Sequence, residues 1–119
     1  MTKPSRKPFS LPVLHIMLAL AEGPKHGYAI KRQVETRTEG AIRLGPGTLY
    51  EAIQRLEDAG FIEESPAKAG GGPTNGQQAQ RRYYRLTERG VRSLKDELRQ
   101  LGQLVDAART NARLNKGLA

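Results

Sequence analysis

Residues 45–56 carry a dense set of groups that can hydrogen-bond to phosphates and to base edges. Glycine at the start of a helix lets backbone N–H groups approach an anion, which the helix dipole also favours. Tyr50 and Gln54 lie four residues apart, as do Glu51 and Arg55, so each pair shares a helix face. Glutamine and arginine can each form two hydrogen bonds with a purine edge. The candidate contact residues are Gly47, Thr48, Tyr50, Glu51, Gln54 and Arg55.

Basic residues elsewhere add candidate contacts with phosphate. The 119-residue chain has 20 Lys and Arg against 12 Asp and Glu, which gives a formal net charge of +8. So basic a domain is typical of proteins that bind polyanions, although it also suits simple solubility. We expect phosphate contacts from Lys31 and from Lys68, Arg81 and Arg82, which flank a glycine-rich loop. The alternatives are a solvated loop and, for residues 45–56, an ordinary surface helix with a packed tyrosine.

The sequence contains few residues that could form a catalytic site or a metal site. The chain has no cysteine, which excludes disulfides, thiolate metal sites and a cysteine nucleophile. His15 and His26 are the only histidines and have no helical pairing, so we expect no zinc site. Glu63 and Glu64 are adjacent in a predicted strand, so their side chains point to opposite faces. We therefore expect a protein that is not an enzyme and needs no cofactor.

Three helices must position these residues. Ser10 is a favourable N-cap for a helix over residues 11–22, and a second helix is predicted over residues 27–38. The third begins at residues 46–48 and ends before Gly60, with its apolar residues on one face. Residues 42–44 fit either one short strand or a linker.

A hairpin and a long helix complete the predicted order. Residues 61–64 and 82–86 are predicted strands around a loop at 66–80. Thr87 is a favourable N-cap for a helix that extends to about residue 113. Its apolar residues form a heptad seam, at Val91, Leu94, Leu98, Leu101, Val105 and Ala108.

This seam could pair with the same seam of a second chain, pack on its own domain or bind another protein. We expect dimerisation, because a complete three-helix core leaves the long helix little to pack on. A two-fold dimer would place its two reading helices roughly 34 Å apart, which predicts a pseudo-palindromic DNA site.

Three helices followed by a hairpin are typical of a winged helix-turn-helix, a mainly α fold with a small β-hairpin. We expect a flexible basic arm at residues 1–9, the winged helix-turn-helix domain at 10–86, a C-terminal dimerisation helix at 87–113 and a flexible tail at 114–119. The longest apolar run, residues 11–21, is too short to span a bilayer, so we expect a cytoplasmic protein.

Several short motifs make the chain resemble the PadR family of bacterial transcriptional regulators. The most specific is GTLY at residues 47–50 followed by RLE at 55–57 and Gly60. The family often has proline after the tyrosine, where this chain has Glu51. The other residues that carry the resemblance are Leu18, His26, Gly27, Tyr28, Ile30, Tyr83, Tyr84, Arg85, Leu86, Thr87 and Gly90.

The resemblance implies a homodimer formed through the C-terminal helix and, as in some members, release from DNA by an aromatic or drug-like effector. From the charge, the element order and the resemblance together, we expect a sequence-specific DNA-binding regulator, in the role of a repressor. The alternative is a winged-helix adaptor that binds a protein or ligand without reading DNA sequence.

Overall fold

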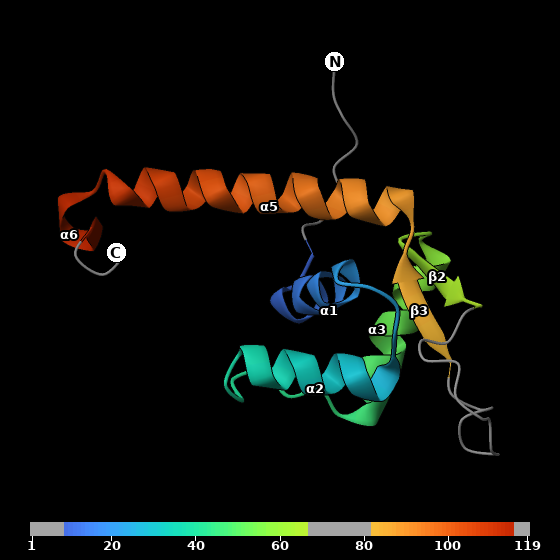
Figure 1. The fold of residues 1–119 in the computed structure, drawn as a ribbon. Coiled ribbons are helices and arrows are strands. Elements are labelled where there is room, and N and C mark those ends of the chain that lie inside the picture. Colours follow the sequence, from blue (N-terminus) through green and yellow to red (C-terminus); the bar gives the residue numbers. More distant parts are fainter. Residues whose placement is uncertain (1–8, 67–81, 116–119) are drawn as a thin grey trace.

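A computed structural model describes residues 9–66 and 82–115 of the chain. The predicted order of three helices, a hairpin and a long helix is confirmed, as Figure 1 shows. The elements are α1 (Leu11–Ala21), β1 (Lys25–His26), α2 (Gly27–Arg37), α3 (Pro46–Asp58), β2 (Ile62–Ser65), β3 (Tyr83–Leu86), α5 (Glu88–Arg109) and α6 (Ala112–Asn115).

Side-chain caps fix the first residues of three of the helices. Ser10, His26 and Thr87 each have extended backbone and accept a hydrogen bond from the backbone N–H three residues later, at 3.3, 3.3 and 3.0 Å. Each cap satisfies an N–H group that the helix itself leaves free. The predicted roles of Ser10 and Thr87 are confirmed, and His26 performs the same task through Nδ1.

The sheet has three antiparallel strands in the order β1-β3-β2. Lys25 of β1 and Glu64 of β2 are both aligned with Tyr84 of the central strand β3. The predicted hairpin is therefore confirmed, but the possible strand at residues 42–44 is wrong, since these residues form a linker. The third strand lies at Lys25–His26, where pairing with β3 rather than local sequence creates it.

The core lies between α1, α2, α3 and the sheet, and Leu94 of α5 completes it. Phe9 lies at the edge of this core and packs edge-to-face on Phe61, with ring centroids 5.3 Å apart. Phe9, the last residue of the expected flexible arm, is therefore held by the packing of its ring, and the rest of that arm lies outside the described residues. The fully or nearly fully buried apolar residues described are Leu14, Ile16, Met17, Ala19, Leu20, Ile30, Val34, Leu44, Leu49, Ile53, Leu56, Phe61, Ile62, Tyr84 and Leu94.

Helix α5 begins against the sheet and continues well past α1, so that its C-terminal part and α6 stand clear of the other helices (Figure 1). A Cβ atom at Gly90 would overlap the Phe61 carbonyl oxygen and lie 3.0 Å from the carbonyl carbon, so glycine permits this close approach. The predicted end near residue 113 is wrong: α5 ends at Arg109 and a separate turn, α6, follows. Among the described residues, no helix combines the length and the apolar character needed to cross a bilayer.

Candidate nucleic-acid interface

Helix α3 is anchored by one face and exposed on the other. Leu49, Ile53 and Leu56, at the predicted helical spacing, are only 2, 2 and 4% exposed. Pro46 occupies the first helical position, where its missing N–H costs nothing. All six predicted contact residues of this helix are exposed, namely Gly47, Thr48, Tyr50, Glu51, Gln54 and Arg55.

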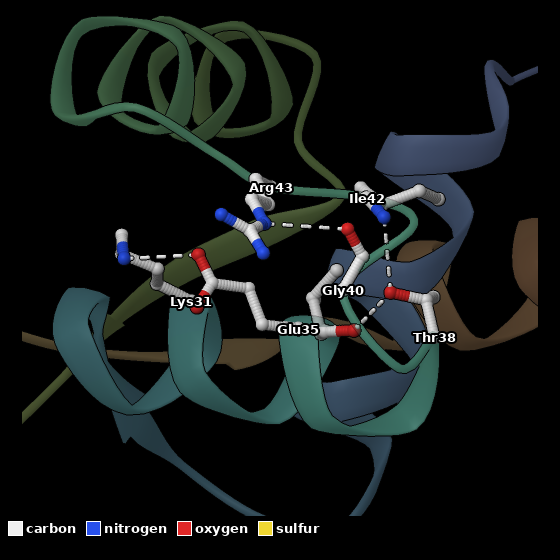
Figure 2. Close-up of polar contacts among 7 residues, drawn as sticks. Lys31, Glu35, Thr38, Gly40, Ile42 and Arg43 are labelled. Carbon is white, nitrogen blue, oxygen red and sulfur yellow. Dashed lines mark hydrogen bonds and ion pairs between the residues drawn. The ribbon is translucent and has the colours of Figure 1, made fainter.

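The connection between α2 and α3 is an ordered turn (Figure 2). The Thr38 hydroxyl donates to a carbonyl oxygen one turn back in α2 at 2.8 Å and accepts from the Ile42 N–H at 3.1 Å. Arg43 Nε donates to the Gly40 carbonyl oxygen at 3.4 Å, and Leu44 is buried. These hydrogen bonds and the buried Leu44 hold both ends of the linker, which favours one arrangement of α2 and α3.

Tyr50 joins α3 to the first turn of α2. A Cβ atom at Gly27 would overlap the Tyr50 hydroxyl and lie 2.9 Å from its Cζ atom, so the phenol ring lies directly over that glycine. Tyr50 is nevertheless 50% exposed. It therefore packs on α2, as the alternative interpretation required, and about half of its surface stays exposed where the two helices meet.

Hydrogen bonds already engage some of the predicted contact residues. Lys31 Nζ lies 2.9 Å from the Glu35 carboxylate, and Gln54 Nε2 donates to Asp58 Oδ1 at 3.0 Å. In the part of the chain that the structure describes, the Arg55 side chain has no hydrogen bond or ion pair. A nucleic acid would therefore meet Arg55 directly, whereas Lys31 and Gln54 would have to exchange an existing partner.

The predicted basic residues of the hairpin are only partly described. Arg82 Nε lies 3.3 Å from a Glu64 carboxylate oxygen across the hairpin, and its side chain is largely exposed. Surface pairs of this kind contribute little to stability, so the guanidinium can turn toward another anion at small cost. Lys68 and Arg81 lie outside the described residues.

A cluster around Glu22 ties the end of α1 to α2. Its carboxylate accepts hydrogen bonds from Gln33 at 2.7 Å and Arg37 at 2.8 Å, and Lys25 lies 3.9 Å away. The hydrogen bond from Gln33, with Arg37 and the nearby positive charges, holds the pKa of Glu22 below its usual value against the opposing effect of desolvation. Within residues 9–66 and 82–115, no three His, Asp or Glu side chains are grouped closely enough to hold a metal ion.

The predicted heptad seam of α5 is not one continuous exposed surface. Leu94 is 5% exposed in the chain's own core, and Leu101 packs against that core. Val91, Leu98 and Val105 remain 37, 40 and 40% exposed, and Ala108 is partly buried. The reason is that α1 covers part of the seam, so the alternative of packing on its own domain holds for that part.

Two exposed apolar residues of the C-terminal region lie outside the predicted seam. Leu104 is 64% and Leu114 52% exposed. Leu104 directly precedes the seam residue Val105, so the two together broaden the apolar surface of the outer part of α5. A search for apolar residues next to the heptad positions would have identified Leu104, which is adjacent to Val105. The exposure of Leu114 could not be predicted in this way, because Leu114 lies in α6, after the turn that ends α5.

A groove of about 620 Å³ lies between the end of α1, β3 and α5. Most of its lining is apolar, including Leu18, Leu86, Val91 and Leu98, and its charged residues are Glu22, Arg85 and Lys95. Apolar grooves of this size with few polar groups are typical of small-molecule sites.

Comparison with known proteins agrees with this architecture. The family model described as "Transcriptional regulator PadR-like family" matches residues 13–96. A 42-residue stretch is 52% identical to an uncharacterized 37.1 kDa protein in transposon TN4556 of Streptomyces fradiae; it covers 35% of this chain but only 12% of that protein.

Two solved structures have the same fold at low sequence identity. A transcriptional regulator from Clostridium thermocellum is 24% identical, with a TM-score of 0.66 over 84% of this chain and 88% of that one. A PadR-like transcriptional regulator from Bacillus cereus is 17% identical, with a TM-score of 0.66 over 82% and 87% of the two chains.

Proposed function

The chain belongs to the PadR-like family of transcriptional regulators, and from this premise we propose that it is a repressor that binds a pseudo-palindromic operator as a homodimer. The family consists of transcriptional regulators and not of enzymes, which agrees with the expectation from the sequence. Membership in such a family implies DNA binding; the repressor role, the two-fold operator and the dimer are the parts proposed here.

The exposed face of α3 is the single observation that carries this proposal. The helix is fixed from below by three buried residues, and its outer surface carries hydrogen-bonding side chains without apolar cover. A Cβ atom added at Gly45 or Gly47 would meet nothing within 4 Å, so the start of the helix is open to an approaching backbone or phosphate.

The residues divide into those that read bases and those that hold phosphates. Gln54 and Arg55, more than two turns into α3, can form paired hydrogen bonds with purine edges in the major groove. The N–H groups at Gly47 and Thr48 and the side chains of Lys31 and Arg82 would hold the DNA backbone. Tyr50, at the joint with α2, can donate its hydroxyl proton to a phosphate or base acceptor.

The outer part of α5 supports a homodimer. Leu104, Val105 and Leu114 are exposed apolar side chains beyond the reach of the chain's own core. Two copies packed through this region would bury them and present two α3 helices to one duplex. The groove beside Leu18 and Leu98 is the place where a small-molecule effector would alter the dimer.

A second candidate function is a protein-binding adaptor. It is favoured by the acidic residues Glu51, Glu57 and Asp58, which outnumber the single basic residue Arg55 on α3. An acidic surface repels phosphate, so this helix would suit a basic protein partner if it did not read bases.

Selection of bound duplexes from a random DNA pool distinguishes the two candidates. We expect an enriched motif with mirrored halves, bound about 1,000-fold or more tightly than a scrambled duplex at 150 mM salt. Replacing both Gln54 and Arg55 by alanine should remove most of this preference. As a matched control, Arg92→Ala, which removes an exposed arginine of α5, should leave the preference for the selected duplex unchanged. Equal binding of selected and scrambled duplexes would favour the adaptor.

A further inference from the structure

We propose that Glu51 makes the protein select cytosine at one position of each half-site, and that its carboxylate weakens binding to all other sequences. The inference rests on the proposed function, since it assumes that α3 enters the major groove. It concerns the one acidic residue in the first two turns of that helix. Glu51 would thus be a specificity-determining residue of α3.

The position of Glu51 on α3 is the first argument. Gly47, Glu51, Gln54 and Asp58 follow the spacing i, i+4, i+7 and i+11, so they form one line along the helix. This line lies on the side away from the buried stripe that contains Ile53. Any surface that contacts α3 from outside therefore meets the Glu51 side chain near the centre of the contact.

The second argument is that the carboxylate is available. Lys31 pairs with Glu35, and Gln54 donates to Asp58, but Glu51 has no hydrogen bond or ion pair with another residue of the described part of the chain. Arg55 lies one turn later at the favourable i+4 spacing, yet the two side chains do not pair. Glu51 therefore reaches a partner with its full charge and all of its acceptor capacity.

The chemistry of the major groove then decides which base can satisfy it. An ionised carboxylate only accepts hydrogen bonds, and phosphate oxygens, guanine N7 and O6 and thymine O4 are all acceptors that repel it. Donors are the exocyclic amino groups of cytosine and adenine. Adenine N7 is an acceptor beside its amino group, whereas cytosine presents the amino group alone, so cytosine is the better match.

A negative charge at this point also changes the balance between affinity and specificity. On a duplex without a matching amino group, the carboxylate is repelled by base acceptors and by nearby phosphates. It also loses hydrating water without gaining a hydrogen bond, and both effects weaken non-specific binding. Basic residues on other elements would supply the affinity, while Glu51 would penalise wrong sequences. This arrangement accounts for an acidic residue at the centre of a helix that contacts a polyanion.

The test compares the sequences selected by the wild-type protein and by Glu51→Gln from one random DNA pool. We expect a cytosine in each wild-type half-site and its loss in the variant, with adenine favoured because glutamine can bond both adenine N6 and N7. The variant should bind the wild-type site about tenfold more weakly and a scrambled duplex more tightly. Glu51→Ala should lose the preference at that position without gaining another.

Glu88→Gln is the matched control, because it removes the same charge from an exposed residue of α5. It should leave both the selected motif and the preference for cytosine unchanged. If the wild-type protein enriches a motif and Glu51→Gln enriches the same motif, the role of Glu51 is refuted while the proposed function stands. If the wild-type protein enriches no motif, the proposed function itself is refuted.

Discussion

Helices α3 and α5 each bury one face in the same core, but the faces that they leave exposed differ in chemistry. Outside its buried stripe, α3 presents hydroxyl, amide, carboxylate and guanidinium groups. The outer part of α5 adds exposed apolar side chains, Leu104 and Val105, beside polar residues such as Gln103 and Asp106. A polar face of this kind suits the mixed donors and acceptors of DNA, whereas an exposed apolar face favours another protein surface.

The difference also exists within α5 itself. Near its start, Gly90 lies against the backbone of Phe61 and Leu94 is buried in the core. Twelve residues later, Gly102 has open space around it. The first part therefore joins α5 to the DNA-binding domain, and the second part is free for a partner.

The largest effect on stability is expected at the start of α5, where this helix packs against the rest of the chain. Gly90→Ala should lower the free energy of unfolding by about 3 kcal/mol, because the added methyl group overlaps the Phe61 carbonyl. Gly102→Ala should instead raise it by up to about 1 kcal/mol, since alanine has the higher helix propensity and meets no neighbour. Denaturant unfolding of both variants measures this, and equal destabilisation would contradict the division of α5 into two parts.

The next effect concerns the exposed apolar face. Leu104→Asp should give a monomer by sedimentation and weaken operator binding about 100-fold, because two half-sites are no longer held together. The stability of the isolated chain should change little, since Leu104 is mostly exposed. Gln103→Asp, with the same new charge on the neighbouring exposed residue, is the control. A dimeric Leu104→Asp protein would remove Leu104 from the interface.

A smaller effect is expected at the joint of α2 and α3. Tyr50→Ala should weaken operator binding about tenfold while the protein remains folded, because the hydroxyl contact and the packing over Gly27 are both lost. Tyr50→Phe keeps the ring and removes only the hydroxyl, so it separates the two contributions. Unchanged affinity of Tyr50→Ala in a gel-shift titration would exclude Tyr50 from the DNA contact.

The smallest effect lies away from both faces, at Glu22. Its pKa is lowered in the folded chain, chiefly by the hydrogen bond from Gln33, so its contribution to stability is present above the unfolded pKa and is lost as the pH falls through the folded one. Glu22→Gln should therefore be less stable than wild type near pH 7, and the two should converge in acid once the pH has fallen below the lowered folded pKa of Glu22. A difference that stays constant with pH would rule out this ionisation.

Local patterns were sufficient to predict most of the fold. The spacing of Leu49, Ile53 and Leu56 predicted the buried stripe of α3, and the capping residues Ser10 and Thr87 predicted two helix starts, because both depend on residues close in sequence. The six exposed residues of α3 follow from the same periodicity. That periodicity also identified the polar face that we propose reads DNA.

Features that depend on distant contacts could not be predicted in this way. Strand β1 has only two residues and exists because it pairs with β3. Helix propensity alone disfavours glycine at position 90, yet Gly90 permits the close contact with the Phe61 backbone. The heptad spacing could not distinguish Leu94, which is buried in the core, from Val105, which stays exposed. Both residues belong to the same apolar pattern, and only contacts with distant parts of the chain separate them.

Footprinting on a selected operator tests the central claim most directly, that two copies joined through α5 place two α3 helices on one duplex. The account predicts two protected stretches related by a two-fold axis, with centres about one helical turn, roughly 10 base pairs, apart. Leu104→Asp at the same protein concentration should protect neither stretch. A single protected stretch without a mirrored second half, or uniform protection along the duplex, would contradict the account.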